Sequence, residues 1–458
     1  MEQSQQEIQY KKMIEQPIKP LILKLAVPTI ISMLVSSLYN MADTYFVSQL
    51  GKSASGAVGV VFSLMAIIQA VGFTLGMGSG SLISRSLGVK RNDRANMFGS
   101  TAFFASLGFG ALITLFGLVF INPLMRGLGA TETVLPYAKD YASYILYGAP
   151  VMSASFVLNN ILRSEGKAKF SMIGIATGGI LNIILDPIFI YGFKLGISGA
   201  AIATLISQVI SFVIMLTSFL RGRTVVKLNF KAVSREFSVL FEIIKTGAPS
   251  FCRQGLASAS TILLNNQAAV YGDAALSAMS IVSKIFMLLF CIGLGIGQGY
   301  QPVIGYNYGA KKWARVKESY LFTYAIGTVV MSAFGAAAFI LAPYIMPLFI
   351  DDSEVIDIGI NALRFQAVTM PLLSTNVMGN MTFQSIGSKA KAVFLSCCRQ
   401  GIFFIPLVLI LPKIFLLTGI EATQAASDFC TFIISLPFVF TFLSSVKAKE
   451  KAELSEKQ

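Results

Sequence analysis

The feature that most constrains this chain is a series of long apolar windows without any charged residue. One runs from Lys52 to Arg85, another from Arg94 to Arg126 and a third from Lys194 to Arg221. Each exceeds the roughly 20 apolar residues that a helix needs to cross a bilayer. Charged residues make up only 13% of the 458 residues, about half of the roughly 25% found in soluble domains. The sequence therefore predicts an all-α polytopic membrane protein.

The lengths of the apolar segments, together with the Gly and Pro residues that separate them, predict twelve transmembrane helices. They are expected near 21–48, 54–82, 96–121, 136–163, 169–192, 197–220, 237–270, 274–301, 318–343, 356–386, 391–416 and 419–446. Residues 1–20 are polar and carry three lysines without an apolar core. They are predicted to form a cytoplasmic N-terminal arm rather than a cleavable signal peptide.

The basic residues indicate how the helices are oriented. If the N-terminus is cytoplasmic, 26 of the 36 lysines and arginines fall in inside segments, and only five fall in outside loops (Lys52, Arg126, Lys139, Lys194 and Lys413). This asymmetry follows the positive-inside rule and places both termini in the cytoplasm. The net charge of +14 then reflects membrane orientation, and no nucleic-acid partner is expected.

The chain contains two copies of one unit. A shift of 221 residues superimposes several prolines, glycines and basic residues without a gap: Lys24 on Lys245, Pro28 on Pro249, Gly51 on Gly272, Gly76 on Gly297 and Arg94 on Arg315. The predicted domains are a six-helix N-terminal lobe (21–221), a cytoplasmic linker (222–236), a six-helix C-terminal lobe (237–446) and a cytoplasmic tail (447–458). Because each copy has six spans, a pseudo-two-fold axis along the membrane normal is expected to relate the two lobes.

Charges at membrane depth are costly, about 2.5–3.5 kcal/mol each on insertion scales, so each calls for a partner or a role. Seven remain once the loops are removed: Asp43, Asp186, Arg253, Lys284, Arg364, Arg399 and Asp428. For the four basic residues the sequence favours structural roles. Arg253 is also a candidate cavity residue, and Asp428 could neutralise one of the basic groups.

The acidic residues of the first lobe lie among polar neighbours. Asn40 lies one turn before Asp43, Asn182 one turn before Asp186, and Thr204 and Gln208 form a similar pair in the next span. Pro187 cannot donate a backbone hydrogen bond and should kink its helix. An oxygen-rich, kinked cluster half-way across the membrane is what a proton or Na⁺ site requires, although polar residues that merely tie helices together remain an alternative.

Several stretches resemble the MATE (multidrug and toxic compound extrusion) transporters, across essentially the whole chain. They are PTIISMLVSSLYNMADTYFVSQLG, GMGSGSLISRSLGVKRNDRA, LRSEGKAKF, LNIILDPIFIYG and GAPSFCRQGLAS. The chain looks most similar to the DinF/MepA-like branch, whose acidic residues concentrate in the N-terminal lobe. The resemblance implies a cation-coupling set of Asp43, Tyr141, Asn182, Asp186 and Thr204. Asn40 and Gln208, by their helical positions beside this set, are candidate cavity residues.

The resemblance implies antiport in a bacterial or archaeal cytoplasmic membrane, in which inward H⁺ or Na⁺ drives export of amphiphilic, often cationic drugs. Na⁺ would be held by Asp43, Asn182, Asp186 and Thr204. We expect no cofactor, a monomer in the lipid bilayer, and hinges at Pro28 and Pro187.

A lipid-linked saccharide flippase of the same superfamily is the alternative, since Arg253, Arg364 and Arg399 could hold a pyrophosphate. An enzyme is not expected, because the chain contains no histidine and no metal-ligand cluster or nucleophile motif. A channel or receptor is also disfavoured by the duplicated twelve-span pattern.

Overall fold

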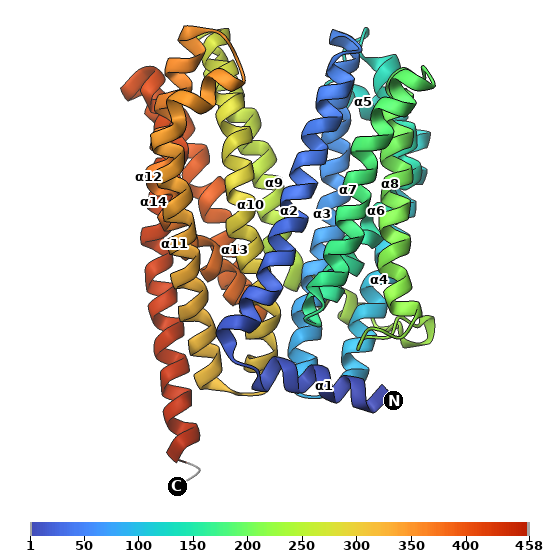
Figure 1. Ribbon diagram of the computed structural model, residues 1–458, viewed down its shortest axis with the longest axis vertical. Helices are drawn as coiled ribbons and strands as arrows, with labels where there is room; N and C mark the ends of the chain where they lie inside the picture. The colour runs from blue at the N-terminus through green and yellow to red at the C-terminus, as the bar shows by residue number, and fades with distance from the viewer. Residues whose placement is uncertain (1, 456–458) are drawn as a thin grey trace. The chain divides into compact units, whose positions relative to one another are not determined.

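The computed structural model describes residues 2–455, which form helices joined by turns and short loops (Figure 1). The elements are α1 (Glu2–Glu15), α2 (Ile18–Ser48), α3 (Lys52–Gly88), α4 (Asn92–Val119), α5 (Ile121–Gly127), α6 (Leu135–Ser164), α7 (Ala168–Pro187), η1 (Ile188–Gly192), α8 (Gly196–Leu220), η2 (Phe230–Ala232), α9 (Phe237–Ala269), α10 (Asp273–Gly309), α11 (Trp313–Ile345), η3 (Met346–Leu348), α12 (Ser353–Ile386), α13 (Lys389–Cys397), η4 (Cys398–Phe403) and α14 (Phe404–Ser455). Two of the short elements, η1 and η4, are π-helical.

Within the described residues, nine helices are long and apolar enough by themselves to cross a membrane. The last of these, Lys389–Ser455, holds two spans, because its helical geometry breaks at Leu416 (φ 53°). Two further helices, α9 and α12, have 33 and 34 residues but carry more polar side chains. Among the described residues, eight helices with one span each, the two spans of Lys389–Ser455, and α9 and α12 together give the twelve spans predicted from the sequence.

Several helices continue past the ends predicted from hydropathy. α3 reaches Gly88 and α10 reaches Gly309, because the backbone hydrogen bonds of a helix do not require an apolar environment. The last helix extends to Ser455. Its end is anchored by the ammonium of Lys449, which lies 4.7 Å from the centre of the Trp313 ring.

The chain divides into two compact units. Unit 1 comprises Met1–Glu15 and Val27–Phe251, and unit 2 comprises Gln16–Ala26 and Cys252–Gln458. Each unit therefore includes the first part of a long helix whose remainder belongs to the other unit: the start of α9 lies in unit 1, and the start of α2 lies in unit 2.

Glycines allow the first parts of these two helices to approach their neighbours closely. Gly247 of α9 lies directly against the main chain of Thr74 in α3, and Gly299 of α10 lies against Ala26 of α2. Neither glycine has room for a Cβ atom beside the neighbouring backbone. Since backbone cannot move aside as a flexible side chain can, both contacts depend on glycine.

Replacing Gly247 by alanine is expected to lower the stability of the protein by about 1–3 kcal/mol, the usual cost of overpacking. Gly255 lies in the same helix with open space around its Cα, so Gly255→Ala is the matched control. This control should be neutral or stabilise the helix by up to about 1 kcal/mol. Thermal unfolding of both variants in detergent provides the comparison, and equal melting temperatures would contradict the close packing.

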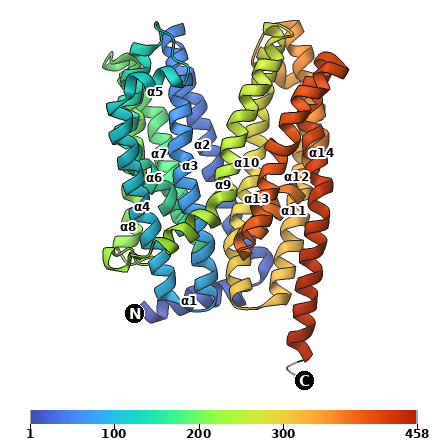
Figure 2. The same ribbon diagram turned by 180° about the vertical axis from the view of Figure 1, so that it is seen from behind.

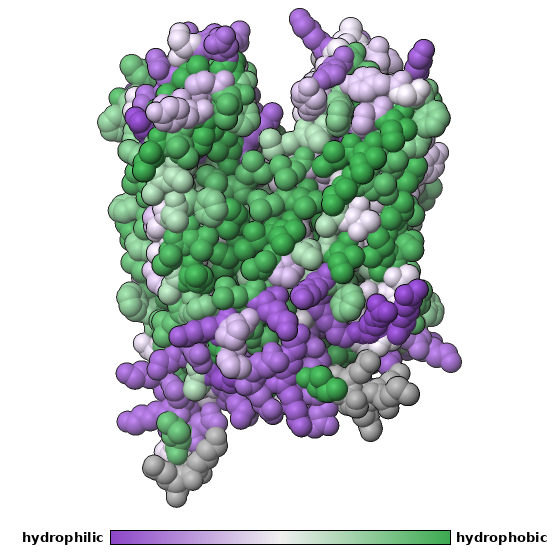
Figure 3. All heavy atoms as spheres, in the orientation of Figure 1, coloured by the Kyte–Doolittle hydropathy of each residue, from purple (hydrophilic) through white to green (hydrophobic). Residues whose placement is uncertain are grey.

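The core of unit 1 is built mainly on α3 and α6. Fully buried side chains from these helices include Val61, Ile68, Tyr141 and Leu146. On the face shown in Figure 3, hydrophobic residues cover the middle of the helices of each unit, and hydrophilic residues gather at their ends. This distribution is what a bilayer requires of membrane-spanning helices.

The N-terminal helix α1 lies across the ends of α3 and α4 within unit 1 (Figure 2). The Gln9 amide donates a hydrogen bond of 2.5 Å to the main-chain oxygen of Glu165, which follows α6. The Glu165 carboxylate is fully buried and accepts hydrogen bonds of 2.9 Å from the amides of Val225 and Val226. One glutamate thus connects the N-terminal arm and the loop after α8.

Burial raises the pKa of Glu165 to about 7, against the opposing effects of Lys167 and of the two backbone amides. If the loop detached, Glu165 would be solvated and its pKa would return towards 4.5. The docked loop therefore binds the proton more tightly than the detached loop does. Protonation accordingly favours docking, and the attachment weakens as the pH rises from about 4.5 to about 7.

Hydrogen exchange of the Val225 and Val226 amides tests this pH dependence. After correction for intrinsic exchange rates, their protection should fall by about tenfold or more between pH 5 and pH 7, since one pKa unit corresponds to a factor of ten. Glu165→Gln should abolish the slope. An unchanged slope in that variant would show that another group is responsible.

Candidate functional site

Unit 1 contains a buried carboxylate that is hydrogen-bonded to a phenol. Asp43 of α2 is 4% exposed and Tyr141 of α6 is fully buried. The Tyr141 hydroxyl donates a hydrogen bond of 3.0 Å to Oδ2 of Asp43. These residues are 98 positions apart in the chain, so the packing of α2 and α6 brings them together.

A second carboxylate lies near the end of α7, which the π-helix η1 follows directly. Asp186 is fully buried, and its Oδ1 accepts a hydrogen bond of 3.1 Å from the Asn182 amide one turn earlier. The same amide lies 3.2 Å from Oγ1 of Thr204 in α8. Asp43 and Asp186 are close enough to interact electrostatically, so the two groups form one acidic cluster.

Three oxygen atoms of this cluster are buried and have no hydrogen-bond donor among the described residues. They are Oδ1 of Asp43, Oδ1 of Asn182 and Oδ2 of Asp186. A buried acceptor without a donor is unfavourable, and a cation or a proton would satisfy it. The oxygen set of carboxylates, amide and hydroxyl fits a hard cation such as Na⁺, while either carboxylate could instead take a proton.

The remaining polar residues predicted for this region have different partners. Gln208 of α8 lies 3.4 Å from the hydroxyl of Tyr39. Asn40 donates a hydrogen bond of 2.7 Å to the carbonyl of Ser36 in its own helix, and in the described contacts it is not bonded to Asp43. Tyr39 was missed by the sequence reasoning, although its position one turn before Asp43 places it on the same helical face.

Both predicted hinge prolines lie in helices that carry an aspartate of the cluster. Pro28 is inside α2, where its carbonyl accepts a hydrogen bond of 2.9 Å from Ser32. Pro187 ends α7, and the chain continues directly as the π-helix η1. The Tyr191 hydroxyl of η1 donates a hydrogen bond of 2.8 Å to the carbonyl of Phe46 in α2. The segment after Pro187 is therefore attached to the same helix that carries Asp43.

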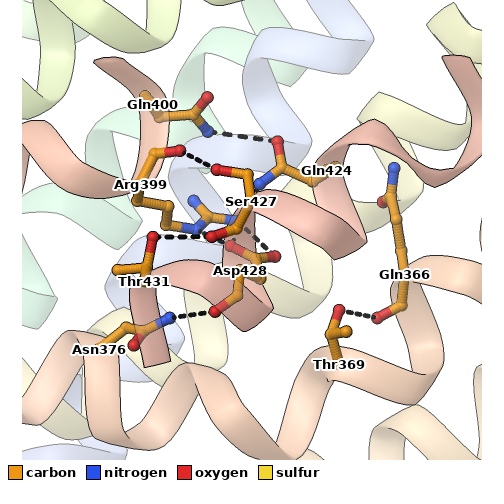
Figure 4. A network of polar contacts seen from close by, with 9 residues as sticks. All are labelled: Gln366, Thr369, Asn376, Arg399, Gln400, Gln424, Ser427, Asp428 and Thr431. Atoms are coloured by element: carbon orange, nitrogen blue, oxygen red, sulfur yellow. Dashed lines mark hydrogen bonds and ion pairs between the residues drawn. The ribbon is translucent and has the colours of Figure 1, made fainter. Parts of the chain in front are cut away.

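The predicted basic residues belong to unit 2 and differ in their surroundings. Arg399 forms an ion pair with Asp428, with Nε and Oδ1 2.6 Å apart (Figure 4). Arg364 lies over the ring of Phe339, with its Nε 3.4 Å from the carbonyl of that residue. Arg253 is partly buried in α9, and Lys284 of α10 is exposed. Asp428 thus neutralises one basic residue, an option that the sequence had left open.

Comparison with known proteins identifies the family. The MatE family model matches residues 28–188 and, a second time, residues 249–410. The multidrug export protein MepA of Staphylococcus aureus (strain MSSA476) is 29% identical over 408 residues, which cover 88% of this chain and 89% of that protein.

Two solved structures extend the similarity to the fold. One is described as the outward-facing conformation of a multidrug resistance MATE family transporter of the MOP superfamily, with 29% identity and a TM-score of 0.90 over 95% of this chain and 98% of that chain. A MOP superfamily transporter from Pyrococcus furiosus has 29% identity and a TM-score of 0.89 over 96% and 98% of the two chains. These findings confirm the predicted all-α membrane fold. The two family-model matches begin 221 residues apart, the shift that aligns the two halves of the sequence. The chain therefore belongs to the MatE family of multi-pass membrane transporters.

Proposed function

We propose that this protein is a multidrug efflux antiporter in which inward movement of H⁺ or Na⁺ drives the export of amphiphilic, often cationic compounds. The observation that carries the proposal is the buried acidic cluster of Asp43 and Asp186, with three oxygen atoms that have no donor among the described residues. Such a cluster at membrane depth favours the binding of a positive charge. MepA, a relative over most of the chain, is a multidrug export protein.

The mechanism couples the charge of the cluster to the packing of α2 within unit 1. Binding of the coupling ion at Asp43 and Asp186 lowers the negative charge of the two carboxylates, which would otherwise repel each other. Loss of that charge lets α2 bend near Pro28 and repack against α7 and α8, and the repacking expels the drug. A cationic drug favours the ionised pair, so drug and ion compete, as linkage requires of an exchanger.

The charge distribution and the relatives support a proposal for the cellular setting. We place the protein in a bacterial or archaeal cytoplasmic membrane as a monomer, with both termini in the cytoplasm. For the domains we propose an N-terminal arm at 1–20, six-helix lobes at 21–221 and 237–446, a linker at 222–236 and a tail at 447–458. The flippase alternative depends on Arg253, Arg364 and Arg399, and two of these three already have partners: Arg399 is paired with Asp428 and Arg364 lies over Phe339.

Ethidium efflux from proteoliposomes tests the proposal. A pH gradient and a Na⁺ gradient are imposed in separate experiments, and the one that drives efflux identifies the coupling ion. A carrier should respond stoichiometrically to that gradient. If neither gradient drives ethidium efflux while the protein flips a lipid-linked sugar, the antiporter proposal fails and the flippase replaces it.

A further inference from the structure

The linker between α8 and α9 concentrates positive charge on the surface of unit 1. Between Leu220, the last residue of α8, and Phe237, the first residue of α9, five basic residues are accompanied by a single acidic residue, Glu236. All five basic side chains are exposed, as is the aromatic ring among them. We refer to these six residues as the linker surface: Arg221, Arg223, Lys227, Phe230, Lys231 and Arg235.

The backbone of the linker is held against the helices of unit 1. The amide of Lys227 donates a hydrogen bond of 2.8 Å to Oδ1 of Asn96, and the amide of Ser234 donates one of 3.0 Å to Oγ1 of Thr101. Both acceptors belong to α4. The Glu165 carboxylate accepts two further amides from the start of the linker. The backbone is therefore attached on its inner side, while the basic and aromatic side chains are exposed.

The linker lies beside a membrane span rather than beyond its end. Thr101 and Phe104 come nine and twelve residues after Asn92, the first residue of α4, which is about 14 and 18 Å along the helix at 1.5 Å per residue. The rings of Phe230 and Phe104 meet edge-on, with their centres 5.3 Å apart. Both ribbon views show the linker alongside the lower part of α4 (Figures 1 and 2). The linker thus runs along the flank of a span, at the depth where lipid headgroups meet the hydrocarbon.

Large apolar side chains accompany the positive charges. Phe230 is 73% exposed, and Leu220 and Phe237 at the two ends of the linker are 76% and 75% exposed. Exposed apolar groups in a cluster mark a contact surface. Aromatic rings are favoured at the boundary between membrane and water, and basic groups beside them attract anionic lipids. The composition of the linker surface therefore fits a lipid with an acidic headgroup.

We infer that the linker surface binds anionic phospholipids of the cytoplasmic leaflet. Clusters of roughly four to eight basic residues next to a membrane span attract acidic headgroups. The lipid phosphates contact the ammonium and guanidinium groups of the linker surface, and the Phe230 ring lies among the acyl chains. This inference does not rest on drug export, because lipid binding is measured without transport.

A fluorescent reporter beside the linker tests the inference. The chain contains a single tryptophan, Trp313. Trp313→Phe combined with Phe230→Trp therefore gives a full-length reporter protein whose only indole lies on the linker surface. The reporter protein is placed in nanodiscs of equal parts phosphatidylglycerol and phosphatidylcholine, and either one lipid or the other carries bromine on its acyl chains. Bromine quenches an indole at contact, so the comparison shows which lipid lies beside the linker.

Brominated phosphatidylglycerol should quench the indole more strongly than brominated phosphatidylcholine does. The difference should correspond to at least about fivefold enrichment of phosphatidylglycerol, the effect of one fully effective basic side chain. Lys231→Gln with Arg235→Gln in the reporter protein should lower the enrichment to less than about twofold. Salt at about 1 M should also lower it, because the Debye length falls to about 3 Å.

A matched double variant provides the control. Lys311→Gln with Lys312→Gln removes the same charge from the exposed turn between α10 and α11 and should leave the enrichment unchanged. All four substituted side chains are exposed, so both double variants should fold, and size-exclusion profiles check this.

Four outcomes would overturn the inference. Equal quenching by the two lipids would show that the linker surface has no headgroup preference. An equal loss in the Lys311 and Lys312 control would assign the preference to overall charge. Absence of quenching by either lipid would show that the surface faces solvent and is open to a soluble partner instead. Loss of the enrichment on adding inorganic phosphate at constant ionic strength would identify a site for free phosphate. None of these outcomes depends on whether the protein exports ethidium.

Discussion

Asp186→Asn is expected to reduce gradient-driven ethidium efflux by about a hundredfold or more, to the rate of protein-free liposomes. The residue is fully buried and bonded to Asn182, and asparagine has nearly the same size and can still accept that hydrogen bond. What the variant loses is the charge, and with it the ability to bind and release the coupling ion. Initial efflux rates under the driving gradient measure the effect.

A neighbouring aspartate provides the control for this substitution. Asp140 lies in α6 of the same unit and is exposed, so Asp140→Asn should retain the wild-type rate. Size-exclusion profiles and melting temperatures of the two variants show whether the fold is intact. A correctly folded Asp186→Asn protein with an efflux rate near that of wild type would contradict a coupling role for Asp186.

Asp43→Asn is expected to abolish coupling to a similar extent, for a related reason. Asp43 accepts the hydrogen bond of Tyr141, and asparagine can accept it too, so the substitution again removes charge more than geometry. Asp43→Glu keeps the charge on a longer side chain and should retain a measurable fraction of the wild-type rate. Loss of efflux in both variants to the same level would indicate that shape, rather than charge, matters at this position.

Tyr141→Phe provides a graded comparison for the same contact. It removes one hydrogen bond to a charged group, worth about 1.5–3 kcal/mol. We therefore expect a reduction in efflux rate of roughly ten- to a hundredfold, smaller than that of Asp43→Asn. Wild-type efflux by Tyr141→Phe would show that the hydroxyl contributes nothing to the site.

Much of the fold was predictable because it depends on properties of single segments. A charge-free apolar window by itself predicts one membrane span. The prolines and glycines that recur at a fixed spacing indicate the duplication, and neither prediction needs to know how the helices pack. The helical period likewise places Asn182 beside Asp186, a contact that the structure contains. These predictions required no information about which helices are neighbours.

Contacts between helices were less accessible from one sequence. The pairing of Arg399 with Asp428 joins residues 29 positions apart, and their separation does not reveal which faces of the two segments meet. The π-helices after Pro187 and Cys397 also lack a hydropathy signal, since they alter hydrogen bonding rather than composition. The first parts of α2 and α9 belong to a different unit from the rest of each helix. The close contacts there form at glycines, and the sequence does not show which residues those glycines touch.

The central claim is that drug and coupling ion compete for the cluster of Asp43 and Asp186. The most direct test is the dissociation constant of ethidium from purified protein, measured across a series of pH values and Na⁺ concentrations. For wild-type protein, ethidium should bind more weakly as the coupling ion increases, by up to about tenfold for each tenfold increase in a singly competing ion, and the double variant Asp43→Asn with Asp186→Asn should lose this dependence. An ethidium affinity of wild-type protein that responds to neither ion would contradict the account.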